Sequence, residues 1–177
     1  MNEKDTGSLD FTEQVETGDF QDGRQSSAAL ALQRGVTRLC TQQAIACLPE
    51  VSLPNHRRAD LLALTPKGEI WIIELKSGLA DFQADKKWHD YLDYCDRFYF
   101  AVAPDFPTDV LPVDVGYILA DKYGGEIIRE GQGPYQAQKL PAARRTLVTR
   151  LMARVGAFRW SRHIDPSPQK GMRRSNS

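Results

Sequence analysis

The amino-acid sequence predicts an α/β fold, a mixed α+β sheet flanked by helices, in one domain over residues 26–163. Three observations support this fold class. An amphipathic helical pattern opens the domain, two apolar strand patterns joined by the turn "TPKG" follow it, and further helical and strand patterns come after them. Elements in this order form a sheet with helices packed against it.

Two amphipathic helices are predicted at the ends of the domain. The first covers residues 28–46, with Ser26 or Ser27 as its N-cap. The last begins at Pro141, because proline suits the first helical position. Apolar residues recur at helical spacing in both helices, which predicts buried stripes formed by Leu32, Val36, Leu39 and Cys40 in the first and Leu147, Leu151, Val155 and Phe158 in the last.

Strands and one more helix are predicted between these two. The segment "EVSLP" at 50–54 is a short strand candidate, and a hairpin covers 58–65 and 69–77. Pro66 presets φ at the first turn position and Gly68 can take a positive φ, so both suit a tight turn. The predicted order is completed by a helix over 79–94, a strand at 97–104, and a strand pair at 115–121 and 125–130.

The two ends of the chain carry opposite charge. Residues 1–25 are polar and aperiodic, which predicts a disordered acidic segment, and residues 1–24 hold seven acids and two bases. Residues 141–177 hold nine bases and one acid, and 164–177 are expected to form a flexible basic tail. This asymmetry suggests an anionic partner for the basic end, with two solvated tails as the alternative.

Several classes of protein are disfavoured by the sequence. No apolar run approaches the roughly 20 residues that a membrane span needs, and the acidic N-terminus lacks the apolar stretch of a secretory signal. The three cysteines show no CxxC or Cys/His ligand spacing, and no P-loop or GxSxG motif is present. We therefore expect a reduced, cytoplasmic protein without structural zinc and without a membrane partner.

The predicted hairpin carries charged residues within an apolar pattern. If residues 66–68 form the loop, Thr65 pairs with Glu69 and the numbers of cross-strand partners sum to 134, so that Asp60 faces Glu74. Two carboxylates placed this way repel each other unless they share a cation or a proton. Lys76 lies two residues after Glu74 and thus on the same face, although a one-residue slip in register would separate the cluster.

A carboxylate pair and a lysine on one face suit metal-assisted hydrolysis of a phosphodiester. The predicted ligands of Mg²⁺ (or Mn²⁺) are Asp60, Glu74 and the backbone carbonyl of Leu75, because this cation prefers hard oxygen ligands. Lys76 would orient or help to deprotonate the attacking water, or stabilise the developing charge. The alternative interpretation is a Glu–Lys ion pair at the end of a strand, without a catalytic role.

The segment after the hairpin supplies further candidates. Helical spacing over 79–94 places Asp81 and Asp85 on one stripe with Trp88, Leu92 and Cys95. Asp85 would be an accessory carboxylate, although acids near a helix N-terminus also have a purely structural role as partners of the helix dipole. Lys86 or Lys87 would meet a phosphate.

Basic residues elsewhere are candidates for contacts with DNA. Arg57 and Arg58 adjoin Asp60, and in the predicted register Arg58 faces Lys76, which would set two cations beside two acids. One-turn arginine pairs occur in the first and last helices, at 34/38 and 150/154, where phosphate contacts and solvated helix faces are alternative interpretations. No element is suited to reading a base sequence, so we expect a DNA partner recognised through its structure or damage.

These residues resemble known nuclease motifs. Asp60, a gap of thirteen residues and Glu74-Leu75-Lys76 resemble the motif of the PD-(D/E)xK nuclease superfamily. From Cys47 to Arg145, segments including "RRADLLAL", "IIELKSGLADFQADKKWHDYLDYCDRFYFAVAPDFP", "LPVDVGYILAD" and "LPAARR" resemble the MmcB-type DNA-repair endonucleases of bacteria. The resemblance implies a restriction-endonuclease-like αβββαβ core, a divalent cation held by Asp60 and Glu74, and a water served by Lys76.

Two departures from the superfamily pattern are visible. Ala59 stands where proline is usual before the first acid, a position that shapes backbone more than chemistry. The first helix lacks the glutamate that many members place there, which leaves Glu50 or Asp85 as substitutes and the number of metals open.

The leading functional hypothesis is a metal-dependent endonuclease that hydrolyses DNA phosphodiester bonds in DNA repair. The alternative is a non-catalytic DNA-binding or scaffold protein that retains the nuclease fold, with binding that follows the arginines and the salt concentration. RNA in place of DNA stays open as well, because a fold does not determine the substrate.

Overall fold

The computed structural model describes residues 26–130 and 139–166 of the chain. Its strands form one six-stranded sheet in the order β1-β2-β3-β4-β5-β6. Strands β3, β4 and β5 run parallel to one another, whereas the other neighbours are antiparallel. The elements are α1 (Ser27–Gln42), β1 (Ala46–Ser52), β2 (Arg58–Leu64), β3 (Ile70–Lys76), α2 (Leu79–Ala84), η1 (Trp88–Tyr94), β4 (Arg97–Val102), η2 (Thr108–Val110), β5 (Gly116–Ala120), β6 (Gly125–Arg129) and α3 (Ala142–Ile164).

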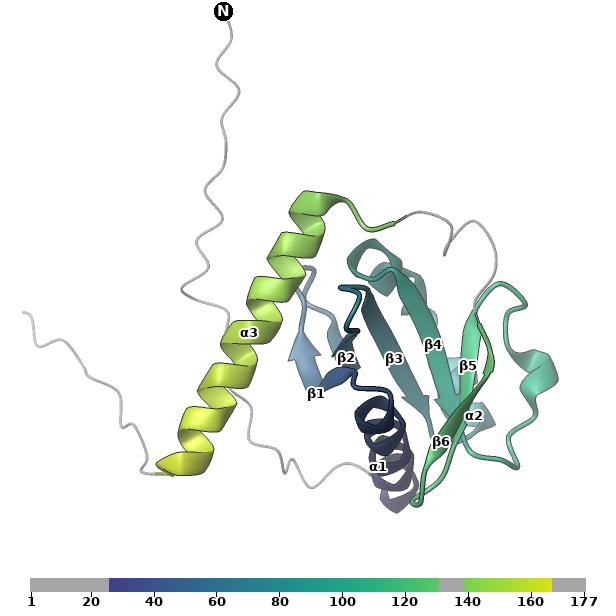
Figure 1. Ribbon diagram of the computed structural model, residues 1–177. Helices are drawn as coiled ribbons and strands as arrows, with labels where there is room; N and C mark the ends of the chain where they lie inside the picture. The colour runs from purple at the N-terminus through teal and green to yellow at the C-terminus, as the bar shows by residue number, and fades with distance from the viewer. Residues whose placement is uncertain (1–25, 131–138, 167–177) are drawn as a thin grey trace, which may run out of the picture.

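Helices cover the sheet on both faces, which confirms the predicted fold class. Helix α3 and the 3₁₀ segment η1 pack on the face that carries Leu62, Ile72 and Phe98. Helix α1 packs on the opposite face, against Leu61, Ile73 and Tyr99. Figure 1 shows α3 crossing beside β1 and β2, with α1 lying apart from it. Strand β3 lies inside the sheet and every one of its residues is buried.

The hairpin of β2 and β3 has the predicted register. Leu64 pairs with Ile70, Leu62 with Ile72 and Leu61 with Ile73, and each pair of numbers sums to 134. At the turn, Gly68 has a φ of 81°, a left-handed conformation that favours glycine. Because side chains alternate along a strand, this register places Asp60 and Glu74 on the same face as Leu62 and Ile72, toward α3 and η1.

Other boundaries differ from the sequence predictions. The first helix ends at Gln42, not 46, because the chain turns at Ala44 (φ 56°) and the Ile45 N–H returns to the Cys40 carbonyl at 2.8 Å. Strand β1 therefore starts at Ala46, four residues before the predicted strand. The stripe predicted for the first helix is buried as expected. In the last helix Leu151 and Val155 are buried, but Leu147 is half-buried and Phe158 is 45% exposed.

The continuous helix expected over 79–94 is wrong. Helix α2 ends at Ala84, Asp85 is extended (φ −80°, ψ 100°), and η1 begins only at Trp88. The Asp85 carboxylate accepts a hydrogen bond from the Lys87 N–H at 2.9 Å and another from the Lys76 Nζ. A side chain that bonds to nearby backbone competes with the helix, which explains the break. Asp81 and Asp85 therefore do not share one helical stripe with the residues of η1.

The predicted terminal segments lie mostly outside the described residues. This applies to the acidic segment at 1–25 and to residues 167–177 of the basic tail. Helix α3 ends at Ile164, the first residue of that predicted tail. Among the residues that the structure describes, no helix combines the length and the apolar character needed to cross a membrane.

A buried carboxylate joins the turn end of the hairpin to β4 and α3. The Asp96 side chain accepts hydrogen bonds from the N–H groups of Ile70 (2.7 Å) and Leu140 (2.9 Å). It also accepts hydrogen bonds from both terminal nitrogens of Arg145, at 2.6 and 2.7 Å. Arg145 donates a further hydrogen bond to the Gly68 carbonyl at 2.6 Å. We call this cluster, made of Asp96, Arg145 and the backbone of Gly68, Ile70 and Leu140, the Asp96 clamp.

The Asp96 clamp should contribute to stability in a pH-dependent way. Burial alone would raise the pKa of Asp96, but the hydrogen bonds from Arg145, Ile70 and Leu140 outweigh burial and hold that pKa below its ordinary value. Substitution Asp96→Ala leaves two buried N–H groups unpaired, each costing about 1–3 kcal/mol, so we expect a loss of at least about 2 kcal/mol in unfolding free energy at neutral pH. Urea unfolding followed by circular dichroism measures this loss.

The sign of the pH effect follows from the lowered pKa of Asp96. Its stabilising contribution is present above the unfolded-state pKa and is lost as the pH falls through the lower, folded-state pKa. The difference between wild type and Asp96→Ala should therefore shrink as the pH falls below about 4. The control is Asp93→Ala, an exposed aspartate of η1 whose backbone carbonyl, not its side chain, accepts from Arg144. Equal losses in the two variants would contradict a structural role for the clamp.

Candidate functional site

The candidate site lies where β2 and β3 separate. Their backbone pairing ends at Leu61 and Ile73, and two carboxylates take over the hydrogen bonds beyond that point. The Asp60 N–H donates to Glu74 Oε1 at 3.1 Å, and the Leu75 N–H donates to Asp60 Oδ2 at 2.8 Å. Each acid thus binds the backbone of the other strand. The structure brings Asp60 and Glu74 together, and we call this point the hairpin fork.

Lys76 lies beside the fork in a buried position. Its side chain is 6% exposed, and its Nζ is 2.6 Å from Asp85 Oδ2 and 3.9 Å from Glu74 Oε2. The Nζ also lies 5.9 Å from the centre of the Phe100 ring. A buried ammonium needs charged or hydrogen-bonding partners. Asp85, placed by the break after α2, provides the closest one.

The electrostatics of the fork are dominated by burial. Burial, reinforced by the Asp60 carboxylate, raises the pKa of Glu74 to about 8. Burial likewise raises the pKa of Asp60, although the hydrogen bond from Leu75 and the charge of Lys76 oppose the shift. Two carboxylates that resist ionising side by side form a site where a cation would be stabilised.

Lys76 and Asp85 behave as an ion pair. Burial would lower the pKa of Lys76, but the hydrogen bond to Asp85 and the charge of Glu74 prevail and raise it. Burial alone would raise the pKa of Asp85, but the hydrogen bonds from Lys76 and the Lys87 N–H outweigh burial and lower it. Both shifts favour the charged forms, so the lysine next to the fork carries a positive charge at neutral pH.

The donor atoms at the fork fit a hard divalent cation. In a β-strand the N–H and C=O of one residue point toward the same neighbouring strand. Because the Leu75 N–H binds Asp60, the Leu75 carbonyl faces the fork as well, beyond the end of the backbone ladder. Within 26–130 and 139–166, no group of three or more His, Cys, Asp or Glu side chains is arranged for a metal. The fitting set is therefore two carboxylates and one carbonyl, and Mg²⁺ commonly completes such a set with waters.

The two predicted accessory acids occupy different positions. Asp85 is the partner of Lys76 and so acts on the lysine. Glu50 has a φ of 50° and falls between the pairs Pro49–Leu61 and Val51–Ala59, which puts it next to Asp60 in the sheet. Its carboxylate is 3.7 Å from Arg58 Nη2. Asp81 closes a local turn, because it accepts from the Ser77 N–H at 3.0 Å.

The predicted DNA-binding residues differ in their ion pairing and in the exposure of their side chains. Arg57 is bound to Asp90 at 2.7 Å, whereas the Arg58 side chain is 58% exposed. Lys86 and Lys87 are exposed next to Asp85. The expectation that Arg58 faces Lys76 is wrong, because the β2–β3 ladder ends before reaching them and Arg58 pairs with Ser52 of β1.

One residue of the site was missed by the sequence reasoning. The Tyr91 side chain is buried, and its hydroxyl donates to the Arg58 carbonyl at 2.9 Å. Burial and the nearby carboxylates of Glu74 and Asp60 raise the pKa of Tyr91. No sequence signal distinguished this tyrosine from an ordinary core aromatic, since its place at the site depends on how η1 packs on the sheet.

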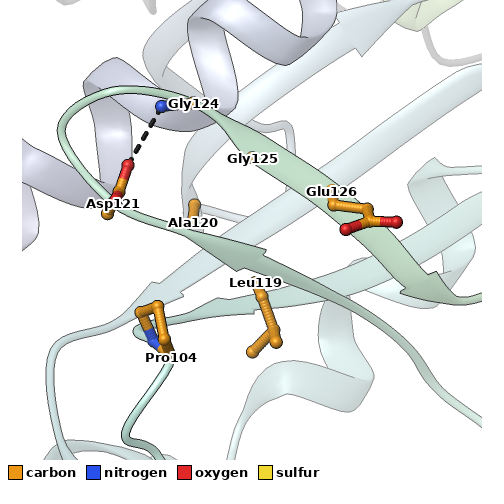
Figure 2. A pocket seen from close by; sticks show the side chains of 7 residues that line it. All are labelled: Pro104, Leu119, Ala120, Asp121, Gly124, Gly125 and Glu126. Carbon is orange, nitrogen blue, oxygen red and sulfur yellow. Dashed lines mark hydrogen bonds between the residues drawn. The ribbon is translucent and has the colours of Figure 1, made fainter.

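A shallow pocket lies elsewhere, at the β5–β6 hairpin, and Figure 2 shows the seven residues that line it: Pro104, Leu119, Ala120, Asp121, Gly124, Gly125 and Glu126. The Gly124 N–H donates to Asp121 Oδ1 at 3.0 Å across the turn. A Cβ added at Gly35 of α1 would lie 2.1 Å from the Asp121 carbonyl oxygen, so this turn is pressed against α1. The pocket includes no predicted site residue, and the β5–β6 turn beside it packs against helix α1.

Comparisons with known proteins agree with the resemblance noted in the sequence. A solved structure of a protein of unknown function from Silicibacter pomeroyi is similar to this chain, with 39% identity and a TM-score of 0.76, over 83% of this chain and 97% of that one. No curated protein matches. The profile of the MmcB-like family, described as "DNA repair protein MmcB-like", matches residues 16–167. The chain therefore belongs to the MmcB-like family of DNA repair proteins.

Proposed function

We propose that this protein is a metal-dependent endonuclease that hydrolyses DNA phosphodiester bonds in DNA repair. The observation that carries the proposal is the hairpin fork, where Asp60, Glu74 and the Leu75 backbone meet beside the buried ammonium of Lys76. An ion pair with a purely structural role would not require two carboxylates to be held together at the open end of a hairpin. Membership of a DNA repair family supports DNA as the substrate.

The residues of the fork have separate roles in this proposal. Asp60, Glu74 and the Leu75 carbonyl would hold Mg²⁺ (or Mn²⁺), which supplies an activated water and neutralises phosphate charge. Asp85 holds Lys76 charged and in place at 2.6 Å. Of the roles expected for this lysine, its ion pair favours stabilisation of developing negative charge over removal of a proton from the water. Glu50, next to Asp60 across β1 and β2, is a candidate for a further outer ligand.

The exposed cations around the fork would bind the phosphate backbone. Arg58, Lys86 and Lys87 are exposed, and each lies within two residues of Asp60 or Asp85 in the sequence. Contacts of this kind give affinity without sequence information. They fit a DNA partner that is recognised through its structure or damage.

Substitution Glu74→Gln should abolish both metal binding and metal-dependent cleavage. The amide keeps the shape of the side chain but removes one of two charges facing the cation, so we expect the cleavage rate to fall by at least about 100-fold. Calorimetry with Mn²⁺ measures binding, and a nicking assay on supercoiled DNA with added Mg²⁺ measures cleavage.

The control for this experiment is Glu126→Gln, which changes an exposed glutamate of β6 outside the fork. It should leave binding and cleavage at the wild-type level. Full activity of Glu74→Gln in a clean preparation would refute the mechanism. A wild-type protein that binds DNA but neither binds metal nor cleaves would favour the non-catalytic DNA-binding alternative.

Arg58→Gln should weaken DNA binding more than Arg57→Gln. The Arg58 side chain is 58% exposed and lies 3.7 Å from Glu50, whereas Arg57 is already bound to Asp90 at 2.7 Å. Loss of one phosphate contact should reduce the slope of log affinity against log salt by about one in the Arg58 variant. Fluorescence anisotropy over a range of salt concentrations, with EDTA to prevent cleavage, measures both variants. An equal or larger effect at Arg57 would mean that the Asp90 ion pair opens on DNA.

A further inference from the structure

Helix α3 carries a concentration of positive charge. Between Ala142 and Ile164 it has six arginines and no aspartate or glutamate. Three of these arginines hold the fold together: Arg144 donates to the Asp93 carbonyl, Arg145 belongs to the Asp96 clamp, and Arg159 donates to the carbonyls of Pro49 and Glu50. The other three, Arg150, Arg154 and Arg162, are exposed.

Aromatic rings are exposed among these cations. Phe158 is 45% exposed and Trp160 is 62% exposed, whereas the other two tryptophans of the chain, Trp71 and Trp88, are 7% and 8% exposed. The Arg154 guanidinium lies 5.7 Å from the centre of the Phe158 ring, and the Trp160 ring lies 5.6 Å from that of His163. Residues 150–164 of α3 therefore expose both cations and aromatic rings, and we call this segment the α3 surface. Phe158 and Trp160 are two residues apart, so their rings project from different sides of the helix.

The α3 surface lies next to the candidate site. Arg159 binds β1 at Pro49 and Glu50, with 2.8 Å from its Nη2 to the Glu50 carbonyl oxygen. Glu50 neighbours Asp60 across the β1–β2 pairing. Adjacent strands are about 4.8 Å apart, so the Arg159 side chain contacts the sheet one strand away from the hairpin fork.

We infer that the α3 surface binds an unpaired strand of DNA and directs it to the hairpin fork. The exposed arginines would contact phosphates, and Trp160 would stack on an unpaired base, a combination common in proteins that bind single strands. In a duplex the bases are already stacked and paired, so exposed rings gain nothing from it. This inference rests on the proposed function, because it names the form of DNA that the same site takes.

Other occupants of the α3 surface fit the observations less well. A helix that lies on a membrane exposes one continuous apolar face, but the apolar face of α3, formed by Val148, Leu151, Met152 and Val155, is buried against the sheet. A protein partner would be expected to meet a contiguous apolar patch. On α3 the exposed apolar side chains are divided between Phe158, which lies against Arg154, and Trp160 with Ile164 one turn further on, so they do not form one large patch. This favours a polyanion with accessible bases.

Tryptophan fluorescence tests the stacking directly. With EDTA present to prevent cleavage, unlabelled oligothymidylate added to the full chain should quench the emission of the exposed Trp160. The same addition should quench Trp160→Phe much less, because the two remaining tryptophans are buried. A hairpin duplex of the same length should quench the wild type only weakly.

Affinity measurements separate stacking from charge. By anisotropy, Trp160→Ala should bind labelled oligothymidylate about 5- to 150-fold more weakly, the range measured for loss of one stacked base. Its affinity for the duplex should change by less than about twofold, since phosphate contacts persist. The matched control is Tyr123→Ala, which removes a 70% exposed ring beside a cation, Lys122, at the β5–β6 turn.

The inference would be overturned by no quenching with oligothymidylate, or by an equal loss of affinity for single strand and duplex in Trp160→Ala. It would also be overturned by a stable dimer that Trp160→Ala dissociates, which would identify a protein interface. If the wild type binds oligothymidylate through Trp160 while neither it nor any variant cleaves DNA, the inference stands and the proposed nuclease function fails. If cleavage is confirmed but Trp160→Ala binds single strands normally, the nuclease function stands and the inference fails.

Discussion

Strand β3 is buried along its whole length, yet it carries two charged residues, and the local structure around the site follows from that constraint. A buried charge must be paired or hydrogen-bonded. Glu74 meets the requirement by accepting the Asp60 N–H, and Lys76 meets it by binding Asp85 at 2.6 Å. The first contact replaces the backbone ladder at the hairpin fork, and the second accompanies the break between α2 and η1.

The buried charges of Glu74 and Lys76 are not explained by the stability of the fold alone. Replacing buried charges by apolar residues of similar size is often neutral or stabilising, so a charged cluster in a core calls for another explanation. Here the acids share a small space, and burial raises the pKa of Glu74 to about 8. Local rules are broken most often at functional sites. This supports the proposal that the fork is an oxygen-lined site for a cation.

The sequence was sufficient for the parts of the fold that depend on local patterns. The turn chemistry of Pro66 and Gly68 and the alternation along the hairpin predicted the register, and with it the approach of Asp60 to Glu74. The break at Asp85 could not be predicted, because helical periodicity over 79–94 says nothing of a partner nine residues back on another element. Tyr91 was missed for a similar reason, and the exposure of Phe158 reflects a helix that continues beyond its packing surface.

The two ends of the hairpin differ in a way that suits a site at one of them. At the turn, the Asp96 clamp ties Gly68 and Ile70 to the start of α3 through Arg145. At the other end, backbone pairing stops and the strands separate at Asp60 and Glu74. Helix α3 begins at the clamped end and reaches β1 beside the fork through Arg159. One rigid helix thus fixes where the open end lies relative to the basic, aromatic surface next to it, so the geometry of the site is set by contacts outside it.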